Sequence, residues 1–87
     1  MSYAVRIARQ AERYVYRLPR PAQQRILRRL EQIAADPYGQ HTKPLQGFPG
    51  RRAARVGGWR IVFTVDDEER RVDVSDIGPR GEVYRRL

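Results

Sequence analysis

The spacing of the apolar residues changes from one regular period to another near the middle of this chain. Between residues 22 and 34 they recur every three or four positions, which is the period of an α-helix with one buried face. These residues are Ala22, Ile26, Leu30, Ile33 and Ala34. From residue 52 onwards apolar and polar side chains alternate, as they do in half-buried β-strands. Helices followed by strands predict an α+β domain.

The first part of the chain is predicted to form one strand and one short helix. Tyr3, Val5 and Ile7 alternate with their neighbours and indicate an opening strand. Apolar residues at helical spacing then cover residues 11–18 and stop at Pro19, which cannot continue a helix.

A second, longer helix is expected to begin at Pro21, because a proline ring suits the first helical turn. The helix should end before Pro37, since the residue before a proline disfavours helical geometry. Residues 37–50 are rich in Pro and Gly and are interpreted as a loop. Leu45 and Phe48 are expected to anchor this loop on the core.

Two hairpins are predicted in the C-terminal half. Gly57 and Gly58 separate two alternating runs, 52–56 and 59–65, and tolerate the positive φ of a two-residue turn. This turn predicts the pairs Val56 with Trp59, Arg55 with Arg60, Ala54 with Ile61 and Ala53 with Val62. A second turn at residues 66–69 predicts the pairs Phe63 with Val72, Ile61 with Val74 and Arg60 with Ser75.

The predicted registers divide the three-stranded meander into two faces. The apolar face is expected to pack on both helices. It comprises Ala54, Val56, Trp59, Ile61, Phe63, Val65, Val72 and Val74. The opposite face is expected to carry Arg55, Arg60, Asp73 and Ser75.

The length and composition indicate one cytoplasmic domain over residues 1–87. A chain of 87 residues can bury one hydrophobic core but not two. No apolar run is long enough to span a bilayer, so no membrane partner is expected. Arg6 and Arg9 interrupt any secretory signal. The absence of cysteine excludes disulfides, thiolate metal sites and thiol nucleophiles.

The charge of the chain predicts an anionic partner. Eighteen Lys and Arg residues oppose ten Asp and Glu residues, which gives a net charge of +8 at pH 7. Seventeen of these cations are arginines, whose planar guanidinium groups bind phosphate in a bidentate manner and stack on bases. Composition therefore favours nucleic acid as the partner.

Four residues are expected to converge on the polar face of the sheet. Arg55 and Arg60 would be direct cross-strand neighbours, where like charges repel each other. The segment after the last strand leaves the sheet at the end that carries Arg60, so Arg80 and Tyr84 are expected to fold back over this face. A solvated face in which Asp73 compensates the arginines is the alternative interpretation.

Three segments resemble motifs of a known family. They are Leu45 Gln46 Gly47, then Arg55 Val56 Gly57 Gly58 Trp59 Arg60 Ile61 Val62 Phe63, and then Ile77 Gly78 Pro79 Arg80 Gly81 Glu82 Val83 Tyr84. In this order and spacing they resemble the RelE-type toxins of bacterial toxin–antitoxin pairs, over nearly the whole chain. The resemblance implies a RelE-like fold and an endoribonuclease that cleaves messenger RNA in the ribosomal A site, with a cognate acidic antitoxin as inhibitor.

The resemblance also implies roles for single residues. Arg60 matches the arginine that binds phosphate, Arg80 the arginine near the leaving 5′ oxygen, and Tyr84 the tyrosine that orients the nucleotide. Arg55 suits the same task of stabilising charge on the phosphate oxygens. The base that removes the 2′ proton stays open, because arginine is a poor base and this chain has Ala53 and Arg55 where family members can have lysines.

No cofactor and no metal are expected in this chemistry. The only histidine, His41, lies in the Pro- and Gly-rich loop and is interpreted as a solvated residue rather than a base. The acidic run over residues 66–69 is interpreted as a turn rather than a metal site.

Further arginines are candidate contacts to RNA. They are Arg51 and Arg52, together with the ridge of Arg25, Arg28 and Arg29 opposite the apolar stripe of the second helix. The ridge would contact ribosomal RNA or simply be solvated. The expected partners are messenger RNA, the 70S ribosome and the antitoxin, with operator DNA bound only through the antitoxin.

Two other functions fit the same sequence features. ParE-like relatives share the fold and bind an enzyme such as gyrase without cutting RNA, but they usually lack the final arginine and tyrosine. A non-catalytic RNA-binding domain would use the basic face for backbone contacts alone.

Overall fold

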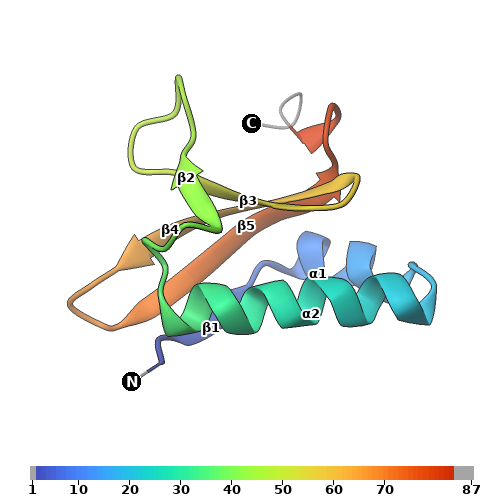
Figure 1. Cartoon of the computed structure of the whole chain (residues 1–87), viewed down its shortest axis with the longest axis horizontal. Coiled ribbons are helices and arrows are strands. Elements are labelled where there is room, and N and C mark those ends of the chain that lie inside the picture. Colours follow the sequence, from blue (N-terminus) through green and yellow to red (C-terminus); the bar gives the residue numbers. More distant parts are fainter. Residues whose placement is uncertain (1, 84–87) are drawn as a thin grey trace.

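Two helices lie against one face of a five-stranded sheet in the computed structural model, which describes residues 2–83 (Figure 1). The strand order is β1-β5-β4-β3-β2, with β1 parallel to β5 and all other neighbours antiparallel. The elements are β1 (Ala4–Ile7), α1 (Arg9–Tyr16), α2 (Arg20–Ala35), β2 (Thr42–Pro44), β3 (Arg52–Val56), β4 (Trp59–Asp66) and β5 (Arg71–Pro79). Among these elements, no helix combines the length and apolar character needed to cross a membrane. The expected α+β fold is confirmed.

Most of the predicted elements are present. The opening strand is β1, and the two expected helices are α1 and α2. Pro21 lies in the first turn of α2, where a helix loses no hydrogen bond to a proline. All the pairs predicted across the 57–58 turn occur between β3 and β4. Gly57 has the left-handed φ of 56° that this turn requires.

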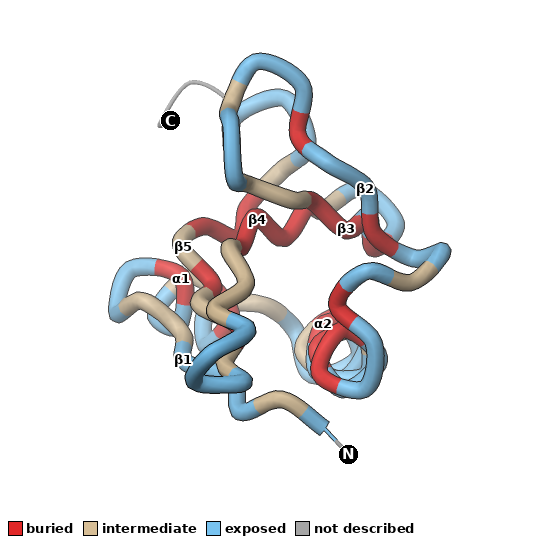
Figure 2. Tube along the Cα trace, turned by 90° about the vertical axis from the view of Figure 1, so that its left-hand side faces the viewer, coloured by how far each residue is buried: buried red, intermediate tan, exposed pale blue. Residues whose placement is uncertain are grey.

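The main hydrophobic core lies between the helices and the sheet. Figure 2 shows that buried stretches concentrate in β3, β4 and β5 and on one side of α2. The core comprises Ala11, Val15, Ile26, Leu30, Ile33, Ala54, Val56, Ile61, Phe63, Val72, Val74 and Ile77. Trp59 and Val65 pack against it, so every strand residue assigned to the apolar face lies there.

The register predicted for the second hairpin is wrong. The observed pairs are Phe63 with Val74, Ile61 with Ile77 and Arg60 with Gly78, where the sequence predicted Val72, Val74 and Ser75. The loop spans residues 67–70 rather than 66–69, and Ser75 is an additional residue at a bulge opposite the 62–63 step. The bulge allows Val74 and Ile77, three positions apart, to face the same core.

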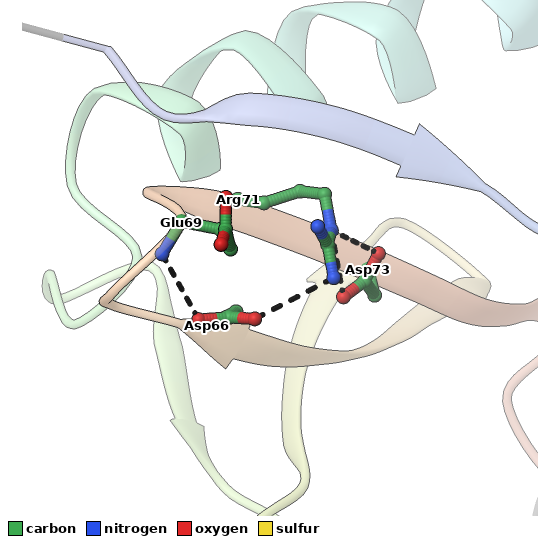
Figure 3. Close-up of polar contacts among 4 residues, drawn as sticks. All are labelled: Asp66, Glu69, Arg71 and Asp73. Atoms are coloured by element: carbon green, nitrogen blue, oxygen red, sulfur yellow. Dashed lines mark hydrogen bonds and ion pairs between the residues drawn. The ribbon is translucent and has the colours of Figure 1, made fainter.

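Polar contacts fix this second loop (Figure 3). The backbone N–H of Glu69 donates to Asp66 Oδ1 at 3.1 Å. Arg71 Nη2 lies 3.5 Å from Asp66 Oδ2, and Arg71 Nε donates to Asp73 Oδ1 at 2.9 Å. Arg70 adopts a left-handed φ of 50° at the end of the loop. Side-chain bonds of this kind decide turn geometry, and the alternation of apolar residues does not reveal them.

The face turned away from the helices also differs from expectation. It carries a second apolar cluster formed by Leu45, Ala53, Val62 and Val83, with Phe48 packed against it. Leu45 and Phe48 therefore anchor the 37–50 segment, as predicted, but on the far face of the sheet. The same segment contains β2, which was not predicted and which pairs with β3.

Asp67, in the loop between β4 and β5, connects this loop to the residues before β1 and to the segment after α2. Tyr3 Oη donates to Asp67 Oδ1 at 2.7 Å, and Tyr38 Oη donates to Asp67 Oδ2 at 2.6 Å. The hydrogen bonds from Tyr38 and then Tyr3 lower the pKa of Asp67. The guanidinium of Arg70 lies 4.5 Å from the ring centre of Tyr3, and that of Arg52 lies 5.1 Å from the ring centre of Tyr38.

The substitution Asp67→Asn should lower the melting temperature at neutral pH. The pKa of Asp67 is lower in the folded chain, so its stabilising effect is complete above the ordinary carboxyl pKa and is lost as the pH falls through the lowered folded value. Thermal unfolding between about pH 3 and pH 7 measures this effect. The variant should lose less stability on acidification than the wild type, with Glu68→Gln in the same loop as control. Equal acid dependence in wild type and Asp67→Asn would contradict this role.

Candidate nucleic-acid interface

Arg55 of β3 and Arg60 of β4 lie directly opposite each other, as predicted. Strand alternation places both on the face turned away from the helices, together with Ala53 and Val62. Arg55 is exposed, whereas only 8% of the surface of Arg60 is accessible. Like charges at opposite positions of a sheet repel each other, and burial strengthens the repulsion by lowering the local dielectric constant.

Arg80 adds a third guanidinium group to this pair. Its backbone N–H donates to the carbonyl of Gly58 at 3.0 Å, which holds the start of the C-terminal segment against the first hairpin turn. Burial lowers the pKa of Arg60, and the positive charges of Arg80 and Arg55 lower it further. Arginine nevertheless stays protonated in proteins, so Arg60 is a buried cation. The structure thus brings together three of the four residues predicted for catalysis.

The fourth predicted residue, Tyr84, lies outside the described residues. The chain is placed over this face as far as Val83, which is buried in the second apolar cluster. A hydrogen bond of 3.0 Å from the backbone N–H of Glu82 to the carbonyl of Pro79 turns the segment back. Residues 80–83 therefore fold over the sheet as the sequence predicted.

A hollow of about 220 Å³ opens beside Arg55 and Arg60. Its lining comprises Gln40, His41, Thr42, Lys43, Ala53, Ala54, Arg55 and Arg60. Lys43, the only lysine of the chain, lies opposite Ala53 in the β2–β3 ladder. Lys43 was not predicted as a site residue, because a three-residue strand that ends in a proline has no recognisable alternation. His41 was interpreted as a solvated residue because it lies in a Pro- and Gly-rich segment.

The predicted arginine ridge of α2 lies beside the first hairpin turn. A second hollow of about 220 Å³ is lined there by Arg25, Arg28, Arg29, Gln32, Val56 and Gly57. A Cβ atom on Gly57 would lie 2.8 Å from Arg25 Nη2, so this glycine admits the guanidinium as well as closing the turn. Arg29 Nη1 donates to Gln32 Oε1 at 2.9 Å. Basic side chains therefore lie on both sides of the turn.

Arg51 and Arg52 do not lie at the hollow beside Arg55 and Arg60. Arg52 Nη2 donates to Thr42 Oγ1 at 2.9 Å and Arg52 Nε donates to the carbonyl of Pro37 at 3.1 Å, so Arg52 holds the segment before β2. Arg51 is half-buried at a different hollow, which also contains Tyr38. Neither side chain lines the hollow at Arg55.

Four acidic residues of the described chain are consecutive, at positions 66–69. Asp73, which was considered as a counter-charge for the arginine pair, is bonded to Arg71 instead. Asp76 is a buried acid, and it accepts a hydrogen bond of 3.4 Å from Gln10 Nε2. Within residues 2–83, no three His, Asp or Glu side chains lie close enough together to hold a metal ion.

Comparisons with known proteins agree with this fold. A family model described as the ParE toxin of the type II toxin–antitoxin system parDE matches residues 5–84. Toxin RelG of Mycobacterium tuberculosis is 31% identical over 91 residues, which cover 99% of this chain and 100% of that protein. The RelBE2 toxin–antitoxin complex of the same organism has a chain with a TM-score of 0.80 and 26% identity, covering 92% of this chain and 100% of that chain.

Two further solved structures share the fold. A chain of the archaeal RelE–RelB complex of Pyrococcus horikoshii has a TM-score of 0.79 and 23% identity, covering 93% of this chain and 98% of that chain. The isolated RelE toxin of E. coli has a TM-score of 0.78 and 24% identity, covering 98% of this chain and 94% of that chain. The fold is that of a type II toxin. The family match over most of the chain shows that the protein belongs to the RelE/ParE superfamily.

The cross-strand arginine pair should destabilise the free protein. Arg55→Gln keeps a similar side-chain length and removes one like charge, so it should stabilise the fold by about 0.2–1 kcal/mol at low salt. Added salt should reduce the difference from wild type, because it screens the repulsion of exposed charges. Thermal unfolding at low and high ionic strength measures both effects. Arg6→Gln is the control. Arg6 lies opposite an acid, Asp73, so its replacement should not stabilise the fold. A salt-independent loss of stability in Arg55→Gln would contradict the repulsion.

Proposed function

We propose that this toxin is an endoribonuclease that cleaves messenger RNA in the ribosomal A site. The observation that carries the proposal is the convergence of Arg55, Arg60 and Arg80 on one face of the sheet. Like charges at opposite positions of a sheet repel each other, and a cluster of arginines at one place is suited to bind the negative charge of an RNA phosphate. Membership of the RelE/ParE toxin superfamily also supports this proposal.

The proposed reaction is an internal transesterification. The 2′ oxygen loses its proton and forms a bond to the adjacent phosphorus atom, while the bond from phosphorus to the 5′ oxygen breaks. The 5′ oxygen gains a proton, so the products carry a 2′,3′-cyclic phosphate and a 5′-hydroxyl group. Negative charge grows on the phosphate oxygens in the transition state, where fixed cations in a partly buried site stabilise it strongly.

Each arginine has a place in this scheme. Arg60 is held by burial and has the least freedom to move away from the phosphate, while Arg55 lies beside it. Arg80 is fixed through its backbone at Gly58 and would stabilise charge on the leaving 5′ oxygen. The role of Tyr84 as a stacking platform for the nucleotide rests on its position in the motif alone.

Arg60→Ala and Arg80→Ala should each lower the single-turnover cleavage rate on programmed ribosomes by on the order of a hundredfold or more. Binding should fall much less, because these cations act mainly on charge that develops during the reaction. Arg28→Ala on α2 removes the same charge away from the pair. It should weaken association and leave the saturated rate unchanged. Equal losses of binding and rate in the two site variants would mean that these arginines hold RNA without cutting it.

The second proposed partner is an acidic antitoxin encoded beside the toxin. A net charge of +8 on a small domain favours an acidic segment that folds over the basic face. The structurally similar RelE and RelBE2 toxins were solved in complexes with antitoxins.

Expression of the toxin alone should therefore arrest bacterial growth, and co-expression of the adjacent small protein should restore growth and yield a copurifying complex. An adjacent protein that neither binds nor restores growth would contradict the antitoxin proposal.

Primer extension on messenger RNA from the arrested cells distinguishes a RelE-like nuclease from a ParE-like toxin that binds gyrase. Transcripts cut within codons support the nuclease, whereas intact transcripts favour the gyrase-directed activity that the ParE family match also allows.

A further inference from the structure

The proposed cleavage lacks a group that removes the 2′ proton. Arg55, Arg60 and Arg80 stay protonated and cannot accept it. The chain has no lysine at position 53 or 55, where family members can have one. The three arginines therefore cannot supply the proton acceptor, and the reaction needs another group at this site.

The β2 register directs the side chain of Lys43 to this face. Lys43 lies opposite Ala53, and Thr42 lies opposite Ala54 of the helix-facing side. His41 lies in the turn directly before β2, next to Thr42. The lining of the hollow agrees with this placement, because His41, Lys43, Arg55 and Arg60 all contribute to it. The only histidine of the chain thus shares one cavity with two of the three converging arginines.

The backbone at His41 is held in place by its neighbour. Thr42 is buried, and its hydroxyl group donates to the carbonyl of Pro37 at 2.7 Å. The backbone N–H of Thr42 donates to the carbonyl of Gly39 at 3.0 Å, and Arg52 Nη2 donates to the hydroxyl group at 2.9 Å. These contacts place an exposed imidazole at the rim of the hollow on a fixed support.

We propose that His41 is the catalytic base of this site, which accepts the proton of the attacking 2′-hydroxyl group. The proposal rests on the nuclease function proposed above. The imidazole takes the 2′ proton as the bond to phosphorus forms, and it returns a proton to the departing 5′ oxygen through solvent, so the net reaction neither consumes nor releases a proton. Lys43 adds a further cation for the phosphate.

Among the described residues, the other charged side chains that line the hollow are cations. They are Lys43 from β2, Arg55 from β3 and Arg60 from β4. Lysine and arginine side chains are ordinarily protonated near neutral pH, whereas histidine exchanges its proton in this range. The acid closest along the chain, Asp36, is engaged by the backbone N–H of Tyr38 at 3.3 Å.

Single-turnover cleavage on programmed ribosomes with His41→Ala tests this assignment. The rate should fall by about a hundredfold or more, and added imidazole should restore part of it. The loss of rate towards acidic pH, which imidazole protonation causes in the wild type, should be absent in the variant. Glu68→Gln, at an exposed position outside the hollow, is the control and should keep the wild-type rate. Lys43→Ala should weaken binding and keep the wild-type pH profile.

The outcomes separate this proposal from the nuclease function. A wild type that cleaves while His41→Ala keeps its rate and pH profile overturns the role of His41 alone. A slower variant that imidazole does not rescue and whose pH profile is unchanged also overturns it, because the loss would then be structural. A wild type that cuts no RNA under any condition overturns both proposals.

Discussion

The pairing of β3 with β4 is the constraint on which the rest of the structure depends. The turn at Gly57 and Gly58 allows a single register, and this register assigns every side chain of both strands to a face. Apolar side chains on one face join the core that lies between the sheet and the helices. On the other face the same register sets Arg55 opposite Arg60, so the stability of the fold and the charge of the site come from one set of hydrogen bonds.

The sequence predicts those parts of the fold that local chemistry controls. Proline positions and helical spacing located both helices, and the paired glycines determined the first hairpin to the residue. The second hairpin could not be predicted to the residue, because Asp66 bonds within its loop and Ser75 forms a bulge that releases Val74 and Ile77 to the same core. The short strand β2 was missed because it exists only through pairing with β3 and through the buried hydroxyl group of Thr42.

The sequence predicted part of the candidate site, as it predicted part of the fold. Arg55, Arg60 and Arg80 follow from the first hairpin and from the return of the C-terminal segment, both of which leave signals in the sequence. Lys43 does not, since its position depends on the unpredicted β2 ladder, and neither does His41, which lies in the turn directly before it. The positions of the arginines follow from the register of the first hairpin and from the return of the C-terminal segment. The position of His41 depends on tertiary contacts that the sequence pattern does not reveal.

We propose that the cluster of arginines stabilises the charge on a phosphate that is attacked by the neighbouring 2′ oxygen of the RNA. The most direct measurement compares cleavage of ordinary messenger RNA on programmed ribosomes with that of the same message carrying a 2′-deoxy nucleotide at the cut, together with the chemical identity of the new ends. The account predicts 2′,3′-cyclic phosphate and 5′-hydroxyl ends on the ordinary message and no cut at the deoxy position, although the toxin still binds. Cleavage of the deoxy message at an equal rate, or ends that carry a 5′-phosphate, would contradict it.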